Sequence, residues 1–453
     1  MIDLDALSRA YGSRVAVRTP DAETGYDALI ERALALRERL VAGGLLPGDR
    51  VALACARDVD TVATALALAS HGCAIMPASS ELTETEREDV CAAFGARWIG
   101  DGGPGAPPKS APEEIPDLAQ ALLSSGSTGA PKIVLRSRGQ VEAGVRIHGS
   151  TVGLHADDRV LALVPLSHSY GFNSVMQGAL LEGASIVLPP STHPRGVAQT
   201  VLATGVTLFP GPAIFFDMMN RFLQSAGPSL RSVRACIAVG DITSADTWQT
   251  FTRSFGVPLW QSYGASEAGP VLLNRDGAVD DEGRLALGTP YREVEALLWD
   301  DAGRPVPDGT VGEIVVRSPA VALGYQGEGD GASRVEDGLF FSGDLAVRRD
   351  DGVVCFAGRA KLLIATAGRK VDPMEVERVL LAHPAVVDAA VVPHREGDRE
   401  IVRAVVVCQG KVAATELIDH CSASLSAYKV PRLVDFRDAL PRNDAGKLQR
   451  EAL

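Results

Sequence analysis

Short apolar, strand-like runs alternate with helix-like patterns along the first two thirds of the chain. Three such pairs are the strand-like runs 51–55, 160–165 and 233–239, followed by the helix-like runs 59–69, 173–181 and 244–255. Strands that alternate with helices in this way are typical of layered α/β domains, in which the helices cover the faces of a sheet. The pattern therefore predicts an α/β fold built from layered subdomains.

The pattern changes near residue 285, where short strand-like runs separated by turn signals begin. Examples of these turns are Asp-Asp-Ala-Gly at 300–303 and Pro-Asp-Gly at 307–309. Such turns predict a β-rich subdomain over about 285–359, which closes a large N-terminal domain of residues 1–359. The remaining residues, 360–453, have the pattern of a small α+β domain, so we expect a separable C-terminal domain.

Composition and hydropathy fit a globular chain without a membrane segment. Of the 453 residues, 46% are hydrophobic and 22% are charged, which disfavours both disorder and membrane insertion. The longest apolar stretch, 62–76, is interrupted by polar residues and is too short to cross a bilayer. The N-terminus lacks the basic and apolar regions of a secretion signal, so we expect a cytoplasmic protein.

Charge and cysteine usage narrow the classes of partner. The net charge is −13 and no basic stripe is present, which disfavours a nucleic-acid partner. Any anionic ligand must then be bound by a local cluster of cations. The seven cysteines form no Cys-x-x-Cys pair, so we expect reduced core residues rather than a disulfide framework or a zinc site.

The strongest chemical signal is a loop of small and hydroxylated residues between two apolar runs. Its residues are Ser124, Ser125, Gly126, Ser127, Thr128, Gly129, Ala130, Pro131 and Lys132. Small residues let backbone N–H groups approach a polyphosphate, hydroxyl groups add donors, and a lysine adds a cation. The spacing is not that of a Walker loop. By itself the segment fits either a phosphate-binding loop or a polar hairpin turn.

This loop resembles the phosphate loop of the adenylate-forming superfamily, which includes acyl-CoA and aryl-CoA synthetases, luciferases and nonribosomal adenylation domains. Four further motifs of that family follow in its order: QSYGASE at 261–267, FSGD at 341–344, GRAK at 358–361 with GRKVDPMEVE at 368–377, and PRNDAGKLQR at 441–450. The resemblance covers nearly the whole chain. It implies an enzyme that activates a carboxylic acid with ATP as an acyl-adenylate and releases pyrophosphate.

The resemblance also implies which residues contact ATP besides the loop. These are Gly240, Asp241, Ser262, Tyr263, Gly264, Ala265, Ser266, Asp344, Arg359 and Lys447. Asp344 would accept hydrogen bonds from the ribose hydroxyls with help from Arg359, and Glu267 would coordinate Mg²⁺, which prefers oxygen ligands. Outside their motifs, Glu267 could equally be a solvated acid, and Asp344 with Arg359 a structural ion pair.

Four residues form the implied catalytic set: Lys447, His168, Thr128 and Glu267. A carboxylate that attacks the α-phosphorus of ATP builds up negative charge, so cations and a metal ion suit the reaction. Lys447 would bridge the α-phosphate and the attacking carboxylate, although a lone terminal lysine is usually just solvated. His168 would orient the carboxylate or swing aside for the thiol; the alternative is a core histidine bonded to a backbone carbonyl.

The segment around His168 resembles the part of the family that lines the acyl pocket. The implied pocket residues are His168, Ser169, Tyr170, Phe172, Asn173, Gly240 and Gly264. No aspartate stands in this segment to hold an α-ammonium group, which favours an aromatic or short-to-medium acid over an amino acid. Asp241 would either meet a polar group of the substrate or cap the helix that follows it.

The resemblance implies a second step in which the acyl group passes to a thiol. Family members rotate the C-terminal domain after adenylation, with Lys361 at the hinge and Gly368 in the thiol channel. CoA is the expected acceptor. The alternatives are the phosphopantetheine of a carrier protein acting in trans and another nucleophile. The expected oligomeric state is a monomer or a homodimer.

Overall fold

The computed structural model describes the chain except residues 1, 101–102, 105–113, 125–131, 224–229, 328–332, 360–363, 367–368, 372, 397–398 and 443–447. The chain divides into two units, which are described separately. The first comprises residues 1–297, 315–342 and 349–355, and the second residues 298–314, 343–348 and 356–453. The domain boundary expected between residues 359 and 360 stays a prediction.

A nine-stranded sheet in the first unit has the order β15-β14-β13-β12-β11-β9-β10-β1-β2. Its strands are β1 (Val15–Arg18), β2 (Glu23–Gly25), β9 (Arg159–Leu161), β10 (Ser185–Val187), β11 (Leu208–Pro212), β12 (Ala235–Val239), β13 (Leu259–Ala265), β14 (Gly269–Asn274) and β15 (Thr289–Pro290). The run from β13 to β1 is parallel, and β14, β15 and β2 are antiparallel. All five residues of β12 are buried, as expected of a strand covered on both faces.

A seven-stranded sheet of the first unit has the order β18-β8-β7-β4-β3-β5-β6. Its strands are β3 (Arg50–Cys55), β4 (Ala74–Ser79), β5 (Arg97–Gly100), β6 (Gly103–Pro104), β7 (Leu118–Ser124), β8 (Lys132–Ser137) and β18 (Gly324–Gln326). Strands β5, β3, β4 and β7 are parallel, whereas β8 pairs antiparallel with both β7 and β18. Strand β18 therefore brings a late part of the chain beside β8.

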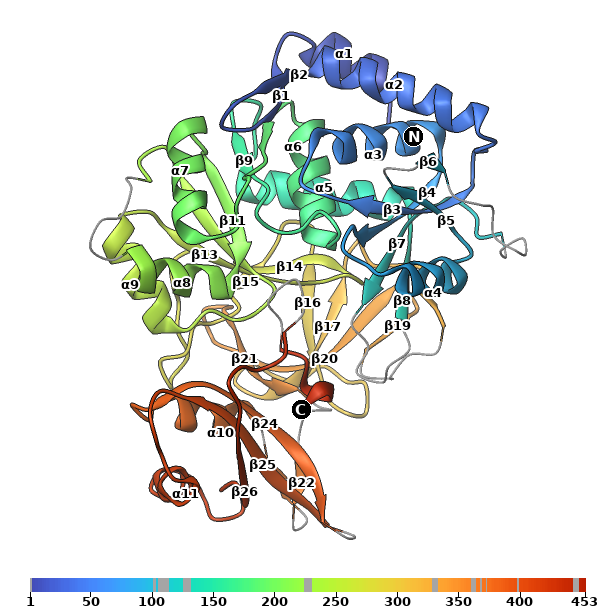
Figure 1. The fold of residues 1–453 in the computed structure, drawn as a ribbon. Coiled ribbons are helices and arrows are strands. Elements are labelled where there is room, and N and C mark those ends of the chain that lie inside the picture. Colours follow the sequence, from blue (N-terminus) through green and yellow to red (C-terminus); the bar gives the residue numbers. More distant parts are fainter. Residues whose placement is uncertain are drawn as a thin grey trace. The chain divides into compact units, whose positions relative to one another are not determined.

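Helices cover these sheets, and one of them contacts both (Figure 1). They are α1 (Leu4–Tyr11), α2 (Tyr26–Ala42), α3 (Val59–His71), α4 (Glu84–Phe94), α5 (Arg138–Val152), η1 (Tyr170–Gln177), α6 (Gly178–Leu181), α7 (Pro194–Thr204), α8 (Ala213–Leu223) and α9 (Ala245–Phe255). Helix α5 contacts β7 and β8 of the seven-stranded sheet and β14 of the nine-stranded sheet. It begins with a capping box formed by Ser137 and Gln140.

Aromatic side chains form much of the core beneath the nine-stranded sheet. Phe216 of α8 is fully buried and meets the ring of Phe251 of α9 edge to face, with a centroid distance of 5.2 Å. The ring of Phe209 of β11 is tilted against that of Phe216, with a centroid distance of 5.6 Å. The helices α8 and α9 are thus held on the sheet by packed aromatic rings, which contribute more than their buried area alone.

The second unit contains a three-stranded sheet with two helices on it. The sheet has the order β24-β25-β26. The elements of this unit are β22 (Ile364–Thr366), β23 (Arg369–Val371), α10 (Pro373–Leu381), β24 (Val386–Glu396), β25 (Arg399–Cys408), α11 (Ala414–Ser422), β26 (Leu433–Phe436) and η2 (Arg450–Ala452). Helix α10 contacts β24 and α11 contacts β26 (Figure 1). Arg450 donates to Glu377 Oε2 of α10 at 2.9 Å, so the chain end is fixed to this core.

A further five-stranded sheet has the order β16-β17-β20-β19, with β21 beside β20. Its strands are β16 (Glu295–Trp299), β17 (Val311–Arg317), β19 (Arg334–Glu336), β20 (Leu339–Arg348) and β21 (Val354–Arg359). These strands lie in the stretch where turn signals predicted β structure. No helix among the described residues is long and apolar enough to cross a membrane.

The predicted α/β class is confirmed, and one strand–helix pair differs in detail from the prediction. The strand expected over 160–165 ends at Leu161, and the helix expected over 173–181 begins at Tyr170 with a π-helical segment. In that segment the N–H of Gly178 bonds to the carbonyl of Asn173, five residues earlier. Wide turns of this kind often occur at functional sites, and apolar periodicity does not reveal them.

Removal of the Phe216 ring tests the aromatic core. Phe216→Ala should lower the free energy of unfolding by about 3–5 kcal/mol, because it leaves a cavity between α8 and α9. The matched control is Phe222→Ala on the same helix, where the side chain is 55% exposed and the expected loss is below about 1 kcal/mol. Urea titration followed by circular dichroism measures both variants. Equal losses in the two would contradict this view of the core.

Candidate active site

The predicted site residues of the first unit follow the carboxyl ends of parallel strands. The predicted acyl segment follows β9, the turn at Gly240 follows β12, and Glu267 follows β13. Because these strands are parallel members of one sheet, the three segments leave it at the same edge. Ligands of open α/β sheets bind at this edge. The topology therefore brings together three segments that are far apart in the sequence.

The predicted phosphate loop begins and ends on paired strands of the seven-stranded sheet. Ser124 ends β7, Lys132 begins β8, and the two are register partners. The loop residues between them lie outside the described part of the chain. They include five of the predicted ATP contacts: Ser125, Gly126, Ser127, Thr128 and Gly129. Their roles, and the catalytic role of Thr128, stay predictions.

Glu267 lies in the tight turn between β13 and β14 and is only 7% exposed. The hairpin needs glycine at position 264, since a Cβ there would lie 2.5 Å from the carbonyl oxygen of Gly269. Tyr325 of β18 donates its hydroxyl to Glu267 Oε1 at 3.1 Å. The N–H of Ala322 donates to the backbone carbonyl of Glu267 at 2.7 Å. The hairpin of one sheet is thereby bonded to the segment that enters β18 of the other.

The Glu267 carboxylate has the chemistry that a magnesium site requires. One oxygen, Oε1, accepts the Tyr325 hydroxyl, whereas Oε2 accepts no hydrogen bond from the described residues. A carboxylate oxygen is a ligand that Mg²⁺ favours. The residue present thus fits the metal implied by its motif.

Lys132 is 3% exposed and its ammonium group is held by residues of the β18–β19 region. Its Nζ lies 3.5 Å from the centroid of the Tyr325 ring. It also donates to the carbonyl and hydroxyl oxygens of Ser333, at 3.0 and 3.1 Å. The sequence did not single out Tyr325 or Ser333. Lys132 and Ser333 are 201 positions apart, and no local pattern links them.

A second buried cation, Arg136, lies near Glu267. Its side chain donates to the carbonyl oxygens of Ala320 and Gln140, at 2.7 and 3.2 Å. Burial lowers the pKa of the guanidinium to about 10, and the charge of Glu267 acts against this shift. Arg136 therefore stays charged at neutral pH. Although the net charge of the chain is negative, Arg136 places a positive charge near the Glu267 hairpin. Sequence patterns did not identify this arginine.

The predicted acyl segment folds tightly against the start of η1. The N–H of His168 donates to the carbonyl of Pro165 at 3.0 Å, and the N–H of Phe172 donates to that of His168 at 2.8 Å. A Cβ at Gly171 would lie 2.2 Å from the Pro165 carbonyl oxygen, so only glycine fits there. The hydroxyl of Ser266 donates to Ser169 Oγ at 3.5 Å. The acyl segment and the QSYGASE motif are therefore in contact.

Asn173 uses its side-chain amide in a reciprocal pair with Gln120 of β7. The two amides exchange hydrogen bonds of 2.7 and 2.9 Å, and both residues are buried. Phe172 is also buried, at 1% exposure. The pair fixes the acyl segment to the strand that leads into the phosphate loop. The predicted pocket roles of Phe172 and Asn173 stay predictions.

Half-buried Tyr170 begins a chain of side chains that reaches the QSYGASE motif through the buried residues His148 and Tyr291. Its hydroxyl lies 3.5 Å from His148 Nε2 of α5, and the imidazole stacks on Tyr291 with a centroid distance of 6.1 Å. The hydroxyl of Tyr291 is 2.9 Å from Ser262 Oγ. His148 is 2% exposed, and burial lowers the pKa of its imidazole to about 3. It is therefore neutral near pH 7.

The turn after β12 is bonded to the first residue of the QSYGASE motif. Gln261 donates to the carbonyl of Asp241 at 2.9 Å and accepts from the N–H of Thr243 at 2.9 Å. Gly240 has a φ of +88°, which suits glycine. The helix α9 is capped by Ser244, so the suggestion that Asp241 caps this helix is wrong. The exposed Asp241 carboxylate instead accepts from the N–H of Ile242.

The predicted ribose residues lie together in the second unit. Arg359 Nε donates to Asp344 Oδ1 at 2.6 Å, and Asp344 is 5% exposed. The N–H of Gly343 donates to Glu313 at 2.9 Å and orients the FSGD strand. The pair is thus formed, and both the ribose role and a structural role remain compatible with it. Lys361, Gly368 and Lys447 lie outside the described residues.

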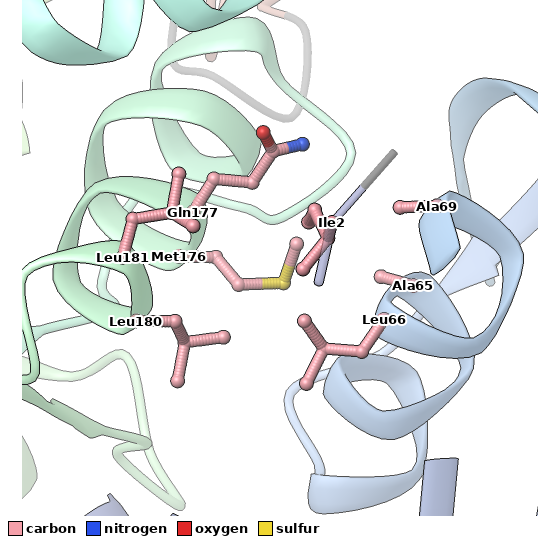
Figure 2. A pocket seen from close by; sticks show the side chains of 8 residues that line it. All are labelled: Ile2, Ala65, Leu66, Ala69, Met176, Gln177, Leu180 and Leu181. Atoms are coloured by element: carbon pink, nitrogen blue, oxygen red, sulfur yellow. The ribbon is translucent and has the colours of Figure 1, made fainter. Parts of the chain in front are cut away.

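A small apolar pocket of the first unit lies between the η1–α6 segment and α3. Figure 2 shows Met176 and Leu180 facing Leu66 of α3 across it. The remaining lining residues are Ile2, Ala65, Ala69, Gln177 and Leu181. None of the described residues that line the pocket is titratable, so they offer no group for adenylation chemistry.

Comparison of the chain with models of known protein families shows the family to which it belongs. Residues 4–101 and 93–326 match the family model described as AMP-binding enzyme, and residues 375–447 match that of the AMP-binding enzyme C-terminal domain. The chain belongs to the AMP-binding enzyme family. This membership confirms the resemblance drawn from the five motifs.

Individual relatives match the sequence of this AMP-binding enzyme over nearly their full length. It is 30% identical to a feruloyl-CoA synthase of Amycolatopsis sp, over 96% of this chain and 94% of the relative. It is 28% identical to a 2-succinylbenzoate–CoA ligase of Bacillus cytotoxicus, over 97% and 95% of the two chains. These relatives confirm the predicted class of enzyme, an acid–thiol ligase.

A solved relative has the same fold as this AMP-binding enzyme. The o-succinylbenzoate coenzyme A synthetase of Bacillus subtilis, in complex with ATP and magnesium ion, superimposes with a TM-score of 0.87 at 25% identity. The match covers 99% of this chain and 98% of that one. The architecture of a large α/β domain followed by a smaller domain is therefore confirmed, and the nucleotide and metal bound there agree with the predicted cofactors.

The buried histidine makes stability depend on pH. The His148 imidazole has a pKa of about 3 in the native protein and an ordinary value of 6.5 in the unfolded chain. Between these two pH values the unfolded chain binds a proton that the native protein does not bind. Stability from this group is present above pH 6.5 and is lost as the pH falls toward about 3, by at most about 1.4 kcal/mol per pH unit.

His148→Phe keeps an aromatic ring between Tyr170 and Tyr291 and removes the titrating group. Urea unfolding at about pH 7 and about pH 5 should therefore show a smaller pH dependence in this variant than in the wild type. His394→Gln serves as the control, because that half-buried imidazole takes part in no ion pair with the described residues, and it should keep the wild-type slope. An unchanged slope in His148→Phe would contradict the assignment.

Proposed function

We propose that this enzyme activates an aromatic carboxylic acid with ATP and Mg²⁺ as an acyl-adenylate, and then transfers the acyl group to CoA. The observation that carries the proposal is the arrangement around Glu267. Its buried carboxylate shares Tyr325 with Lys132, at the end of the phosphate loop, and the neighbouring Ser266 contacts Ser169 of the acyl segment. A metal ligand, a polyphosphate loop and an acyl segment are what acyl-adenylate formation requires.

The relatives support an aromatic acid and CoA as substrates. Both the feruloyl-CoA synthase and the 2-succinylbenzoate–CoA ligase are named for acids that carry a benzene ring, and both are matched over at least 94% of their length. The acyl segment contains no aspartate to hold an ammonium group, which disfavours an amino acid and fits an aromatic or short-to-medium acid. Transfer to a carrier-protein phosphopantetheine is less well supported.

The chain's own groups take defined roles in the proposed reaction. Mg²⁺, bound through Glu267, would supply positive charge for the phosphates of ATP. The Asp344 carboxylate would accept the ribose hydroxyls, with Arg359 holding it in place. Lys447 would stabilise the charge that develops when the acid attacks the α-phosphorus. After pyrophosphate release, rotation at Lys361 would withdraw Lys447 and bring the Gly368 segment to the thiol.

We also propose that the enzyme acts in the cytoplasm as a monomer or a homodimer. All seven cysteines are free thiols, and five of them are buried. Reduced cysteines are typical of proteins in a reducing compartment. ATP and CoA are available in the same compartment.

Replacement of the terminal lysine separates the two half-reactions. Lys447→Ala should lower acid-dependent exchange of pyrophosphate into ATP by about 100-fold or more, because charge on the α-phosphate loses its stabilising cation. Thioester formation from a supplied acyl-adenylate should stay near the wild-type rate. The control is Lys411→Ala, an exposed lysine of the same unit, which should change neither rate. Equal loss of both half-reactions would rule out this role.

Substrate choice tests the remainder of the proposal. With CoA as acceptor, pyrophosphate release should show a higher kcat/KM for hydroxycinnamic and substituted benzoic acids than for alkanoic acids, by about tenfold or more. A holo carrier protein offered in place of CoA should support little turnover. A preference for alkanoic acids, or for the carrier, would overturn the corresponding part of the proposal.

A further inference from the structure

Tyr325 and Ser333 hold the Glu267 region together, and they belong to none of the family motifs identified in the sequence. Tyr325 lies on β18, and its phenol makes two contacts of different kinds. One face of its ring lies 3.5 Å from the Lys132 ammonium, and its hydroxyl donates to Glu267 Oε1 at 3.1 Å. Lys132 and Glu267 are therefore joined through a single tyrosine.

We propose that Lys132 and Tyr325 are positioning residues for the magnesium-binding carboxylate of Glu267, and that Lys132 acts through Tyr325 rather than by contact with the phosphates. The proposal rests on the function proposed above, because it presumes that Glu267 binds Mg²⁺. It changes the expectation for Lys132, which the sequence assigned to the polyphosphate. It also adds Tyr325 to the residues on which the reaction depends.

The contacts of Lys132 argue against direct binding of its ammonium group to the phosphates of ATP. The side chain is 3% exposed, and its ammonium donates to two oxygens of Ser333 while lying on the Tyr325 ring. A lysine that moved to a phosphate would have to give up both hydrogen bonds and the cation–π contact. Where it lies, the cation draws electron density from the phenol and makes the hydroxyl a better hydrogen-bond donor.

The contacts of Glu267 show what such positioning achieves. The Tyr325 hydroxyl holds Oε1, and Ser333 Oγ lies 3.5 Å from the same oxygen and 3.4 Å from the hydroxyl. With Oε1 held, the carboxylate is fixed in rotation and Oε2 is the oxygen presented to a cation. Metal ligands depend on outer hydrogen-bond partners of this kind for their orientation.

The decisive variant is Tyr325→Phe, which keeps the ring beneath Lys132 and removes the hydroxyl. The apparent dissociation constant for Mg²⁺ in acid-dependent pyrophosphate exchange should rise about tenfold, because Glu267 loses its orienting donor. The calorimetric dissociation constant for Mg²⁺-ATP, titrated without acid so that no turnover occurs, should rise as well. KM for the acid should change by less than about twofold, and saturating Mg²⁺ should restore most of kcat. An unchanged Mg²⁺ constant would overturn the proposal. The control is Tyr428→Phe, a second tyrosine beside a lysine, Lys429, which should leave the Mg²⁺ dependence unaltered.

A double-mutant cycle tests whether Lys132 acts through Tyr325. Lys132→Met should also raise the Mg²⁺ constant, and Lys132→Arg, which keeps a cation, should restore part of the loss. In Tyr325→Phe/Lys132→Met the two effects should be less than multiplicative, because both act on one carboxylate. Fully multiplicative effects, or a Lys132→Met defect confined to KM for ATP at saturating Mg²⁺, would show that Lys132 binds phosphate directly.

The wild-type enzyme separates this inference from the function on which it rests. If wild type shows no Mg²⁺-dependent pyrophosphate exchange with any acid of the panel, the proposed function fails. If wild type is active and Tyr325→Phe has the wild-type Mg²⁺ constant, only the positioning role fails. A thermal unfolding curve of each variant, compared with that of wild type, confirms that folded proteins are being compared.

Discussion

The hydrogen bond from Tyr325 to Glu267 occurs where the two large sheets of the first unit meet. Glu267 is in a hairpin of the nine-stranded sheet, and Tyr325 is on the edge strand of the seven-stranded one. A buried carboxylate is costly unless it is hydrogen-bonded and balanced by positive charge. Tyr325, Lys132 and Arg136 provide this balance. The same contacts keep the Glu267 carboxylate at a fixed place relative to Lys132, the first residue of β8.

The acyl segment is also held by hydrogen bonds to both large sheets, but here the bonded groups are neutral. Asn173 pairs with Gln120 of the seven-stranded sheet, and Ser169 contacts Ser266 of the nine-stranded one. Tyr170 adds a buried path through His148, whose imidazole stays neutral because burial opposes its protonation. A segment held from two sides keeps its geometry when substrates bind, which favours catalysis by preorganised groups.

The protein is acidic overall, although its proposed substrate ATP is an anion, and positive charge is concentrated at the candidate site. The net charge of −13 would repel ATP over most of the surface. The local cations, Lys132 and Arg136, are buried at the candidate site, where their fields are less screened than at the surface. Their role is to balance Glu267 inside the protein. Binding of the phosphates then falls to the loop backbone, the metal ion and Lys447 in the function proposed here.

Residue patterns along the chain were enough to predict the α/β class, the order of five motifs and the family, because each of these is a local pattern of residue types. The strand before Gly240 and the helix after it could be located in the same way. Tertiary structure alone decided that Tyr325 and Ser333 complete the Glu267 site, that Arg136 lies behind it, and that the acyl segment begins a π-helix. The contacts of Tyr325 and Ser333 arise where β18 pairs with β8; Tyr325 is the register partner of Val134, and Ser333 is 201 positions from the Lys132 to which it is bonded. Apolar periodicity and motif spacing carry no information about such long-range pairing.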